Sequence, residues 1–289
     1  MNDLCKISER LNFIQFADDT SVFMTHDDPH TLMENFNQEL QKLFDWLLVN
    51  KLVLNVNKTK YMVFTKRNIE YNFEIKIGNE YIERVSSLKF LGVTIDSALS
   101  WHEHIGVICN TVSKSIGVIN RLKFFPQSIL KLLYNAIILP HLNYCNIAWA
   151  NSNDYYVFRL FLLQKRAVRI ISHSSYLAHT KPIFEHLKIL NIFCLNNYNI
   201  AICMYLCFKN QIPARLCSYF SFNLDYHNYN TRSASNYHLP KVRTVVSKHS
   251  IFYKGPIIWN DLTLEIRKSP TLNTFKRKLK LTLIENSST

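Results

Sequence analysis

The amino-acid sequence predicts an α+β fold, with a β-rich N-terminal part followed by a mainly helical remainder. Short β-prone runs separated by turn residues are concentrated before residue 97, whereas helical periodicity dominates after residue 100. The charge changes at the same place: residues 1–97 contain 11 Lys and Arg against 14 Asp and Glu, and residues 98–289 contain 23 against 7. A hydrophobic content of 48% supplies enough apolar side chains for one large core or two smaller ones.

The first expected element is a β-hairpin over residues 11–25, in which two β-prone runs flank the turn residues 17–20. A long helix is expected next, because Asp27 or Asp28 can accept hydrogen bonds from its first N–H groups and Pro29 suits its first turn. Its apolar residues recur three or four positions apart and form a single face, made by Leu32, Phe36, Leu40, Leu43 and Leu47.

Short strands follow this helix and complete the β-rich part. Residues 54–59 predict a turn, and the β-prone runs on either side of Gly78-Asn79 predict a hairpin. The expected strands cover residues 60–65, 73–77, 81–85 and 88–96. The order of hairpin, helix and short antiparallel strands is typical of an α+β arrangement.

Helices are expected for most of the chain after residue 100. Their ranges are residues 100–121, 126–139, 154–172, 191–209 and 271–284, with Pro126 at the start of the second and Pro140 ending it. Residues 218–250 are rich in Tyr, Asn, Ser and His and predict long connections with short strands. We therefore divide the sequence into three regions, residues 1–97, 98–215 and 216–289.

Several features indicate an intracellular protein without a membrane span. Charged residues occupy the N-terminal positions at which a secretory signal has its apolar core. The most apolar stretch, residues 132–149, is interrupted by polar residues and by Pro140, unlike a membrane helix. Seven cysteines without regular spacing indicate reduced thiols, and Cys203 and Cys207 are interpreted as core residues rather than as a metal-binding pair.

The excess of basic residues after residue 97 indicates a polyanionic partner. The net charge is −3 for residues 1–97 and +16 for residues 98–289, which favours nucleic acid first and an anionic membrane second. On the helix over residues 154–172, four basic side chains fall within about 120° of a helical wheel, together with Phe158 and Leu162. A basic face with an aromatic ring suits phosphate contacts and base stacking, and a solvated helix face is the alternative. The four residues are Arg159, Lys165, Arg166 and Arg169.

Asp18 and Asp19 are the residues that suggest catalytic chemistry. Two adjacent carboxylates in a turn repel each other unless a divalent cation or solvent neutralises them. Divalent ions held in this way activate an attacking hydroxyl and stabilise the leaving group in phosphoryl transfer. A bare Asp-Asp pair is also common among solvated turn residues, so the surrounding residues must decide.

Those surroundings resemble the reverse transcriptases of non-long-terminal-repeat retrotransposons. Phe16-Ala17-Asp18-Asp19 in a hairpin is similar to their aromatic-Ala-Asp-Asp box, and residues 52–59 match a Leu-x-x-Asn-x-x-Lys-Thr block. Residues 87–105 resemble the block that leads from the palm to the thumb. Segments near the end resemble the tail of Jockey-like elements, namely residues 239–240, 243–244, 253–256, 259–260 and 275–280.

The resemblance implies a partial palm followed by a mainly helical thumb and a basic C-terminal region. Asp18 and Asp19 then match the metal-binding pair, which holds Mg²⁺ or Mn²⁺ in the parent enzyme. Lys58 matches the basic residue beside the phosphates of the incoming nucleotide, and residues 90–92, Phe90, Leu91 and Gly92, match the segment that supports the primer end. The implied partners are an RNA template and an RNA–DNA duplex.

One departure from the family pattern bears on activity. Such polymerases use a further aspartate on an earlier palm strand, and only fifteen residues precede Phe16 here, with Asp3 in a context that does not match. We therefore expect no polymerase activity from the isolated chain. A non-catalytic nucleic-acid-binding remnant and a non-functional translated remnant are the alternatives.

Overall fold

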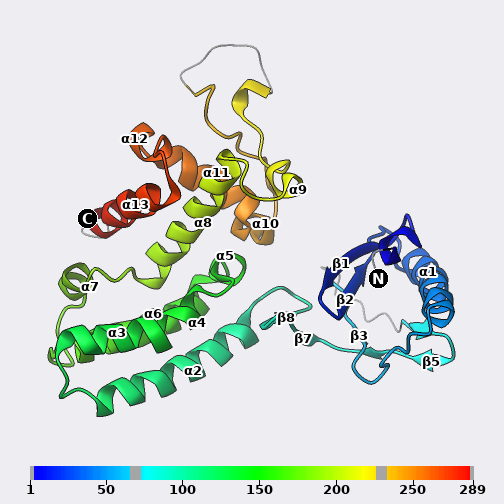
Figure 1. Ribbon diagram of the computed structural model, residues 1–289, viewed down its shortest axis with the longest axis horizontal. Coiled ribbons are helices and arrows are strands. Elements are labelled where there is room, and N and C mark those ends of the chain that lie inside the picture. Colours follow the sequence, from blue (N-terminus) through cyan, green and yellow to red (C-terminus); the bar gives the residue numbers. More distant parts are fainter. Residues whose placement is uncertain (1–2, 66–72, 226–232, 287–289) are drawn as a thin grey trace. The chain divides into compact units, whose positions relative to one another are not determined.

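A computed structural model describes residues 3–65, 73–225 and 233–286 of the chain (Figure 1). The backbone divides into two compact units. The N-terminal unit comprises Met1–Phe90 and Ile95–Ala98, and the helical unit comprises Leu91–Thr94 and Leu99–Thr289. Together they combine helices with small two-stranded sheets, as expected for an α+β protein. The three sequence regions stay a prediction, and residues 66–72 and 226–232 within them lie outside the described residues.

The N-terminal unit consists of one long helix and short strands. Strands β1 and β2 pair antiparallel, β3 pairs with β6 in parallel, and β4 pairs with β5 antiparallel. Strands β7 and β8 form a further two-stranded sheet. The elements before α2 are η1 (Leu4–Lys6), β1 (Asn12–Phe16), β2 (Asp19–Phe23), α1 (Pro29–Val49), β3 (Lys60–Tyr61), β4 (Lys76–Ile77), β5 (Glu80–Tyr81), β6 (Glu83–Arg84), β7 (Ser87–Phe90) and β8 (Val93–Asp96), whose first two residues belong to the helical unit.

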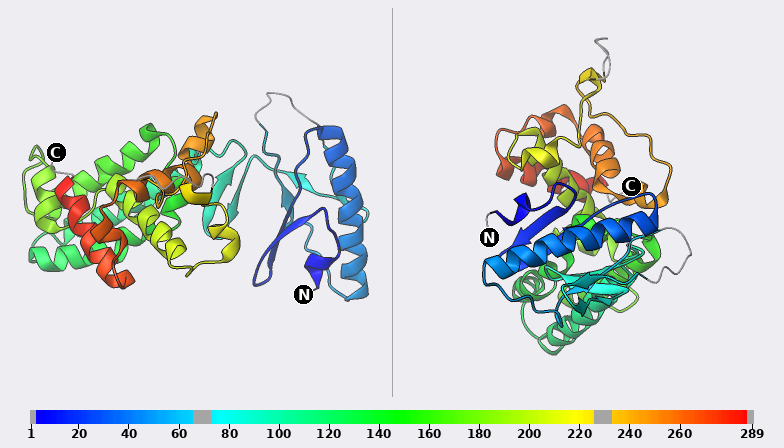
Figure 2. Two further views of the ribbon diagram at one scale, coloured as in Figure 1. Left: turned by 90° about the horizontal axis from the view of Figure 1, so that it is seen from above. Right: turned by 90° about the vertical axis from the view of Figure 1, so that its right-hand side faces the viewer.

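Helix α1 begins where the sequence predicts. The carboxylate of Asp28 accepts a hydrogen bond from the Thr31 N–H at 2.7 Å, and Pro29 follows in the first turn. The predicted apolar face of α1 packs inward, and Leu40 joins Ile75, Ile77 and Ile82 in the core of the unit. The hairpin of β1 and β2 lies beside α1, with Val22 packed against this core (Figures 1 and 2).

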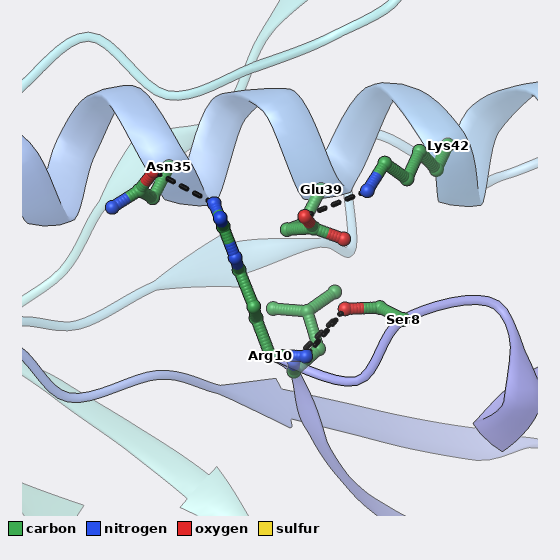
Figure 3. Close-up of polar contacts among 6 residues, drawn as sticks. Ser8, Arg10, Asn35, Glu39 and Lys42 are labelled. Atoms are coloured by element: carbon green, nitrogen blue, oxygen red, sulfur yellow. Dashed lines mark hydrogen bonds and ion pairs between the residues drawn. The ribbon is translucent and has the colours of Figure 1, made fainter.

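Polar contacts tie the chain before β1 to α1 (Figure 3). The Arg10 guanidinium donates to Asn35 Oδ1 at 3.0 Å, and the Arg10 N–H donates to Ser8 Oγ at 3.1 Å. Buried Glu39 accepts from Lys42 Nζ at 2.8 Å. The hydrogen bonds from Lys42 and then from Ser8 lower the pKa of Glu39. The contact between Arg10 and Asn35 holds the start of the hairpin against the helix.

The prediction of one continuous strand over residues 88–96 is wrong. Strands β7 and β8 are separated by a two-residue turn at Leu91-Gly92, where both residues have positive φ, 45° and 84°. Two such residues twist the backbone as a tight hairpin requires. The local sequence Phe-Leu-Gly-Val lacks the usual Asn-Gly signal, so the turn is hidden in an apolar run. The strand expected over residues 60–65 is also shorter, since β3 has two residues.

The helical unit contains the remaining helices. The expected helices over residues 100–121, 154–172, 191–209 and 271–284 agree with α2, α6, α8 and α13. The elements are α2 (His102–Arg121), α3 (Gln127–Ile137), α4 (Leu139–Asn143), α5 (Asn146–Trp149), α6 (Asp154–Ile171), α7 (Lys181–Leu187), α8 (Ile192–Phe208), α9 (Ala214–Cys217), η2 (Asn223–Asp225), α10 (Val245–His249), α11 (Ile251–Asp261), α12 (Leu264–Arg267) and α13 (Leu272–Asn286).

The unit is built around two apolar cores that meet along α8. The first core lies among α2 to α7 and the start of α8, and α2 and α6 lie side by side in it (Figure 1). The second core joins the rest of α8 to α11 and α13. Gln164 is fully buried in the first core, where its Nε2 donates to the Tyr134 hydroxyl at 2.8 Å. Burial raises the pKa of Tyr134 to about 12.

Several helices of the structure were not predicted from the sequence. Pro140 does not end a helix, because α3 stops at Ile137 and Pro140 lies in the first turn of α4. The segment over residues 218–250 contains α10 besides its connections, and an isolated bridge pairs Phe222 with Tyr237. Among the described residues no single helix is both long and apolar enough to cross a bilayer. One pair bent by 46°, α7 with α8, meets the length and composition together.

Candidate functional site

The Asp18–Asp19 pair occupies the tip of the β1–β2 hairpin. Phe16 pairs with Asp19 across the ladder, so Ala17 and Asp18 alone form the turn. Ala17 has a φ of 53°, a left-handed conformation that costs a residue with a Cβ about 1 kcal/mol. Both carboxylates are exposed. Asp18 therefore projects from the turn, whereas Asp19 begins β2 and shares a face of the hairpin with Phe16.

The face of the hairpin that bears Asp19 carries three exposed apolar side chains besides the polar residues Asn12 and Ser21. Ile14, Phe16 and Phe23 alternate along it and keep 47%, 62% and 44% of their surface accessible. The opposite face carries Val22, which packs against the core beside α1. Large exposed apolar side chains gathered on one face are typical of a contact surface.

The described residues do not by themselves fit a two-metal centre. Carboxylate oxygens are ligands that Mg²⁺ and Mn²⁺ prefer, and Asp18 and Asp19 supply them from one turn. A pair of catalytic ions needs further ligands that bridge them. Within residues 3–65, 73–225 and 233–286, no group of three or more His, Cys, Asp or Glu side chains could hold a metal ion.

Lys58 lies at the turn that follows α1. Its side chain is exposed, and its backbone N–H donates to Asn55 Oδ1 at 3.2 Å. Asn55 thereby shapes the turn from which Lys58 projects. The turn belongs to the same unit as the Asp18–Asp19 hairpin, and no hydrogen bond or ion pair among the described residues joins Lys58 to either aspartate.

Phe90, Leu91 and Gly92 end β7 and form the hairpin turn. The hydroxyl of Tyr144, which follows α4, donates to the Leu91 carbonyl at 2.6 Å. A Cβ on Gly92 would lie 3.3 Å from the Tyr144 ring, so the ring and the positive φ both favour glycine here. The turn is thus held by a tyrosine some fifty residues further along the chain, and no sequence signal marks that tyrosine.

The four basic residues of α6 divide into two kinds. Arg159 and Arg166 are exposed. Lys165 and Arg169 are half-buried: Lys165 Nζ lies 4.7 Å from the centroid of the Phe161 ring, and Arg169 Nε donates to the Ala178 carbonyl at 2.9 Å. The opposite side of α6 is buried in the first core. The exposed side also carries Phe158 and Leu162, at 46% and 49% accessible.

The surroundings of α6 are poor in acidic residues. Between residues 104 and 184 the sequence has a single carboxylate, Asp154, against nine Lys and Arg. Asp154 begins α6, about 18 Å along the helix from Arg166. No salt bridge among the described residues involves Arg159 or Arg166. Their positive charge is therefore available to an external anion.

A second basic cluster brings together residues from three elements. Burial lowers the pKa of Lys280 on α13, and the nearby charges of Lys131 and Lys188 lower it further. Lys131 belongs to α3, and Lys188 directly follows α7. Like charges placed together favour a bound anion. The basic run on α13 is visible in the sequence, but its two partners are not.

The segments near the C-terminus that carry the family resemblance are mainly packing residues. Trp259 is buried, and the side chain of Asn260 accepts from the Tyr237 N–H at 3.0 Å and donates to its carbonyl at 2.8 Å. A Cβ on Gly255 would lie 2.7 Å from Met204 Sδ, so glycine lets α11 approach α8 closely. Phe275 stacks on Tyr205 in the second core.

Comparison with known proteins relates the chain to a transposon polymerase. It is similar to the probable RNA-directed DNA polymerase from transposon X-element of Drosophila melanogaster, with 21% identity over 183 residues. The match covers 62% of this chain and 20% of that polymerase, so the chain spans about a fifth of the length of this relative. No protein-family model and no solved structure matches the chain. The similarity supports an origin related to the reverse transcriptase of a transposable element.

Proposed function

We propose that this chain is part of a reverse transcriptase of a Jockey-like, non-long-terminal-repeat retrotransposon. The observation that carries the proposal is the tip of the β1–β2 hairpin, where Asp18 and Asp19 follow Phe16-Ala17 in the order that the family uses. The similarity to the X-element polymerase supports it. The N-terminal unit then corresponds to part of the palm, and the helical unit to the thumb and the C-terminal region.

In the parent enzyme Asp18 and Asp19 are two of the ligands of Mg²⁺ or Mn²⁺. Lys58 contacts the phosphates of the incoming nucleotide, and the Phe90–Gly92 turn supports the primer end. Because the described residues bring no third ligand to Asp18 and Asp19, we propose that the 289 residues alone do not polymerise DNA. A primer-extension assay with Mg²⁺ or Mn²⁺ tests this. Template-dependent synthesis that disappears in Asp18→Ala would contradict it.

The helical unit binds an RNA template or an RNA–DNA duplex through the exposed side of α6. Arg159 and Arg166 bind phosphates there. Each phosphate contact that is lost makes the plot of log affinity against log salt concentration less steep by about 0.9 on a duplex. We expect Arg159→Ala/Arg166→Ala to weaken duplex binding about tenfold at moderate salt and to lower the slope by about 2. Filter binding over a salt series measures both quantities.

A matched double variant controls for the removal of positive charge. Arg215 and Lys241 are exposed basic residues of the same unit that lie outside α6. Arg215→Ala/Lys241→Ala removes the same charge and should leave the slope close to that of the unchanged chain. Equal slopes for the two double variants would refute the α6 interface.

A non-catalytic nucleic-acid-binding protein is the second candidate function. Two observations favour it. The described residues add no further metal ligand to Asp18 and Asp19, and the basic side of α6 can bind nucleic acid without a metal ion. The two candidates differ in the effect of Asp18→Asn. If the chain is a non-catalytic nucleic-acid-binding protein, Asp18→Asn should leave its affinity for nucleic acid unchanged. If it is part of a reverse transcriptase, Asp18→Asn in a longer chain that supplies the further palm strand should remove the Mg²⁺ dependence of nucleotide binding.

A further inference from the structure

A cavity of about 490 Å³ opens at the C-terminal half of α6. Its walls come from three segments that are far apart in the sequence: the end of α2, the last turns of α6 and the loop between α6 and α7. A volume of this size is typical of a site for a small organic ligand. The cavity is lined by Asn120, Arg166, Arg169, Ile170, Ser174 and Tyr176.

The lining combines positive charge with an aromatic ring and contains no carboxylate. Arg169 is fixed by its Nε bond to the Ala178 carbonyl, and its guanidinium lies 5.9 Å from the centroid of the Tyr176 ring. Tyr176 is nevertheless 79% accessible, so most of its ring is open to a ligand. Among the described residues, the guanidinium of Arg166 has no hydrogen bond or ion pair. An unpaired guanidinium group can donate two parallel hydrogen bonds to two oxygens of one phosphate.

We propose that this cavity binds one unpaired nucleotide of a single-stranded RNA or DNA. The base stacks on Tyr176, its edge reaches the Asn120 amide, and the adjoining phosphate lies between Arg166 and Arg169. Stacking on an exposed ring beside arginines is how proteins hold single strands without a sequence preference. A duplex keeps its bases paired and cannot place one in such a cavity. The inference rests on the proposed function and specifies the strand that this end of α6 receives.

A second cavity at the opposite end of α6 supplies the contrast. It measures about 360 Å³ and is lined by Asp154, Tyr155, Phe158 and Phe193. It offers aromatic rings but also a carboxylate and no basic side chain, so a phosphate is disfavoured there. Tyr155 is 70% accessible, similar to Tyr176, which makes Tyr155→Ala a matched control.

Fluorescence anisotropy with the full chain tests the proposal. The probes are a labelled single strand of about twelve nucleotides, long enough to reach beyond one binding module, as RNA and as DNA of the same sequence, and an RNA–DNA duplex. We expect Tyr176→Ala to weaken binding of at least one single strand about tenfold while Tyr176→Phe and Tyr155→Ala stay within about twofold of the unchanged chain. Binding of the duplex should change less than about twofold in all three variants.

Comparison of the RNA and DNA single strands shows which of the two the cavity binds. Thermal unfolding confirms that each variant is folded. An equal effect of Tyr176→Ala and Tyr155→Ala, or an equal weakening on duplex and single strand, would overturn the proposal. If the duplex binds and Arg159→Ala weakens it while Tyr176→Ala leaves both single strands unaffected, the cavity proposal fails and the proposed function stands. If no probe binds at all, the proposed function fails with it.

Discussion

The two units of this protein support their candidate sites with very different amounts of packing. The core of the N-terminal unit consists of Leu40, Ile75, Ile77 and Ile82 with a few partly buried neighbours. The helical unit instead buries residues from α2 to α8 in one core and from α8, α11 and α13 in another. The hairpin with Asp18 and Asp19 leaves three large apolar side chains exposed, whereas α6 is buried along its whole inner side. A site gains rigidity from the element that carries it, so the α6 surface is the better preorganised of the two.

The largest expected difference comes from the same truncation in the two cores. Leu160→Ala leaves a cavity in a fully enclosed position of α6 and should lower the free energy of unfolding by about 3 kcal/mol. Leu40→Ala should cost about 2 kcal/mol, because its small core can relax around the deletion. Urea unfolding followed by circular dichroism measures both costs. Equal costs would remove the contrast between the cores.

Gly92→Ala tests the turn that Tyr144 holds. The substitution puts a Cβ at a φ of 84° and 3.3 Å from the Tyr144 ring, and should cost about 2 kcal/mol. Gly106→Ala on α2 is the control, since a Cβ there meets nothing within 4 Å and alanine favours the helix. Chemical denaturation measures the free energy of unfolding of both variants. An unchanged value for Gly92→Ala would show that the turn is not constrained.

We expect buried His104 to make the helical unit sensitive to acid. Its Nδ1 accepts from the Thr94 N–H at 3.3 Å, and burial lowers its pKa from the ordinary 6.5. Below pH 6.5 His104 becomes protonated in the unfolded chain but stays neutral in the folded chain. The free energy of unfolding therefore falls as the pH falls toward the pKa of His104 in the folded chain. The slope is at most about 1.4 kcal/mol per pH unit.

His104→Gln keeps an acceptor for Thr94 and removes the titration. The difference in unfolding free energy between the two chains should therefore be constant above about pH 7 and change in favour of the variant as the pH falls below 6.5. Parallel pH profiles would rule out His104 as the acid-sensitive group.

The smallest expected effect concerns the start of α8, the helix that both cores share. Asn191 Oδ1 accepts from the Cys194 N–H at 2.9 Å and caps the helix, so Asn191→Ala should cost about 1 kcal/mol. Asn197→Ala, at an exposed position of the same helix, should change stability by less than about 0.5 kcal/mol. Thermal unfolding distinguishes the two. Equal shifts would mean that the cap adds nothing to a helix held by two cores.

Elements with local signals were predictable from the sequence. The start of α1 follows from Asp28 and Pro29, and the ends of α6 follow from its apolar periodicity. The Leu91-Gly92 turn was not, because its residues are apolar and it depends on contact with Tyr144. The helices of residues 245–261 were missed as well, since α11 has Gly255 and Pro256 in its interior and is held by packing on α8.

The sequence by itself determined the order of the longer helices, the concentration of basic charge after residue 97 and the position of Asp18-Asp19 at a hairpin tip. These properties depend on neighbours within a few residues. Only the tertiary structure decided that Arg169 is tethered to Ala178 while Arg166 is not, and that Tyr176 and Asn120 complete a cavity beside them. Such arrangements arise from the packing of α2 on α6, which brings together residues that no local pattern connects.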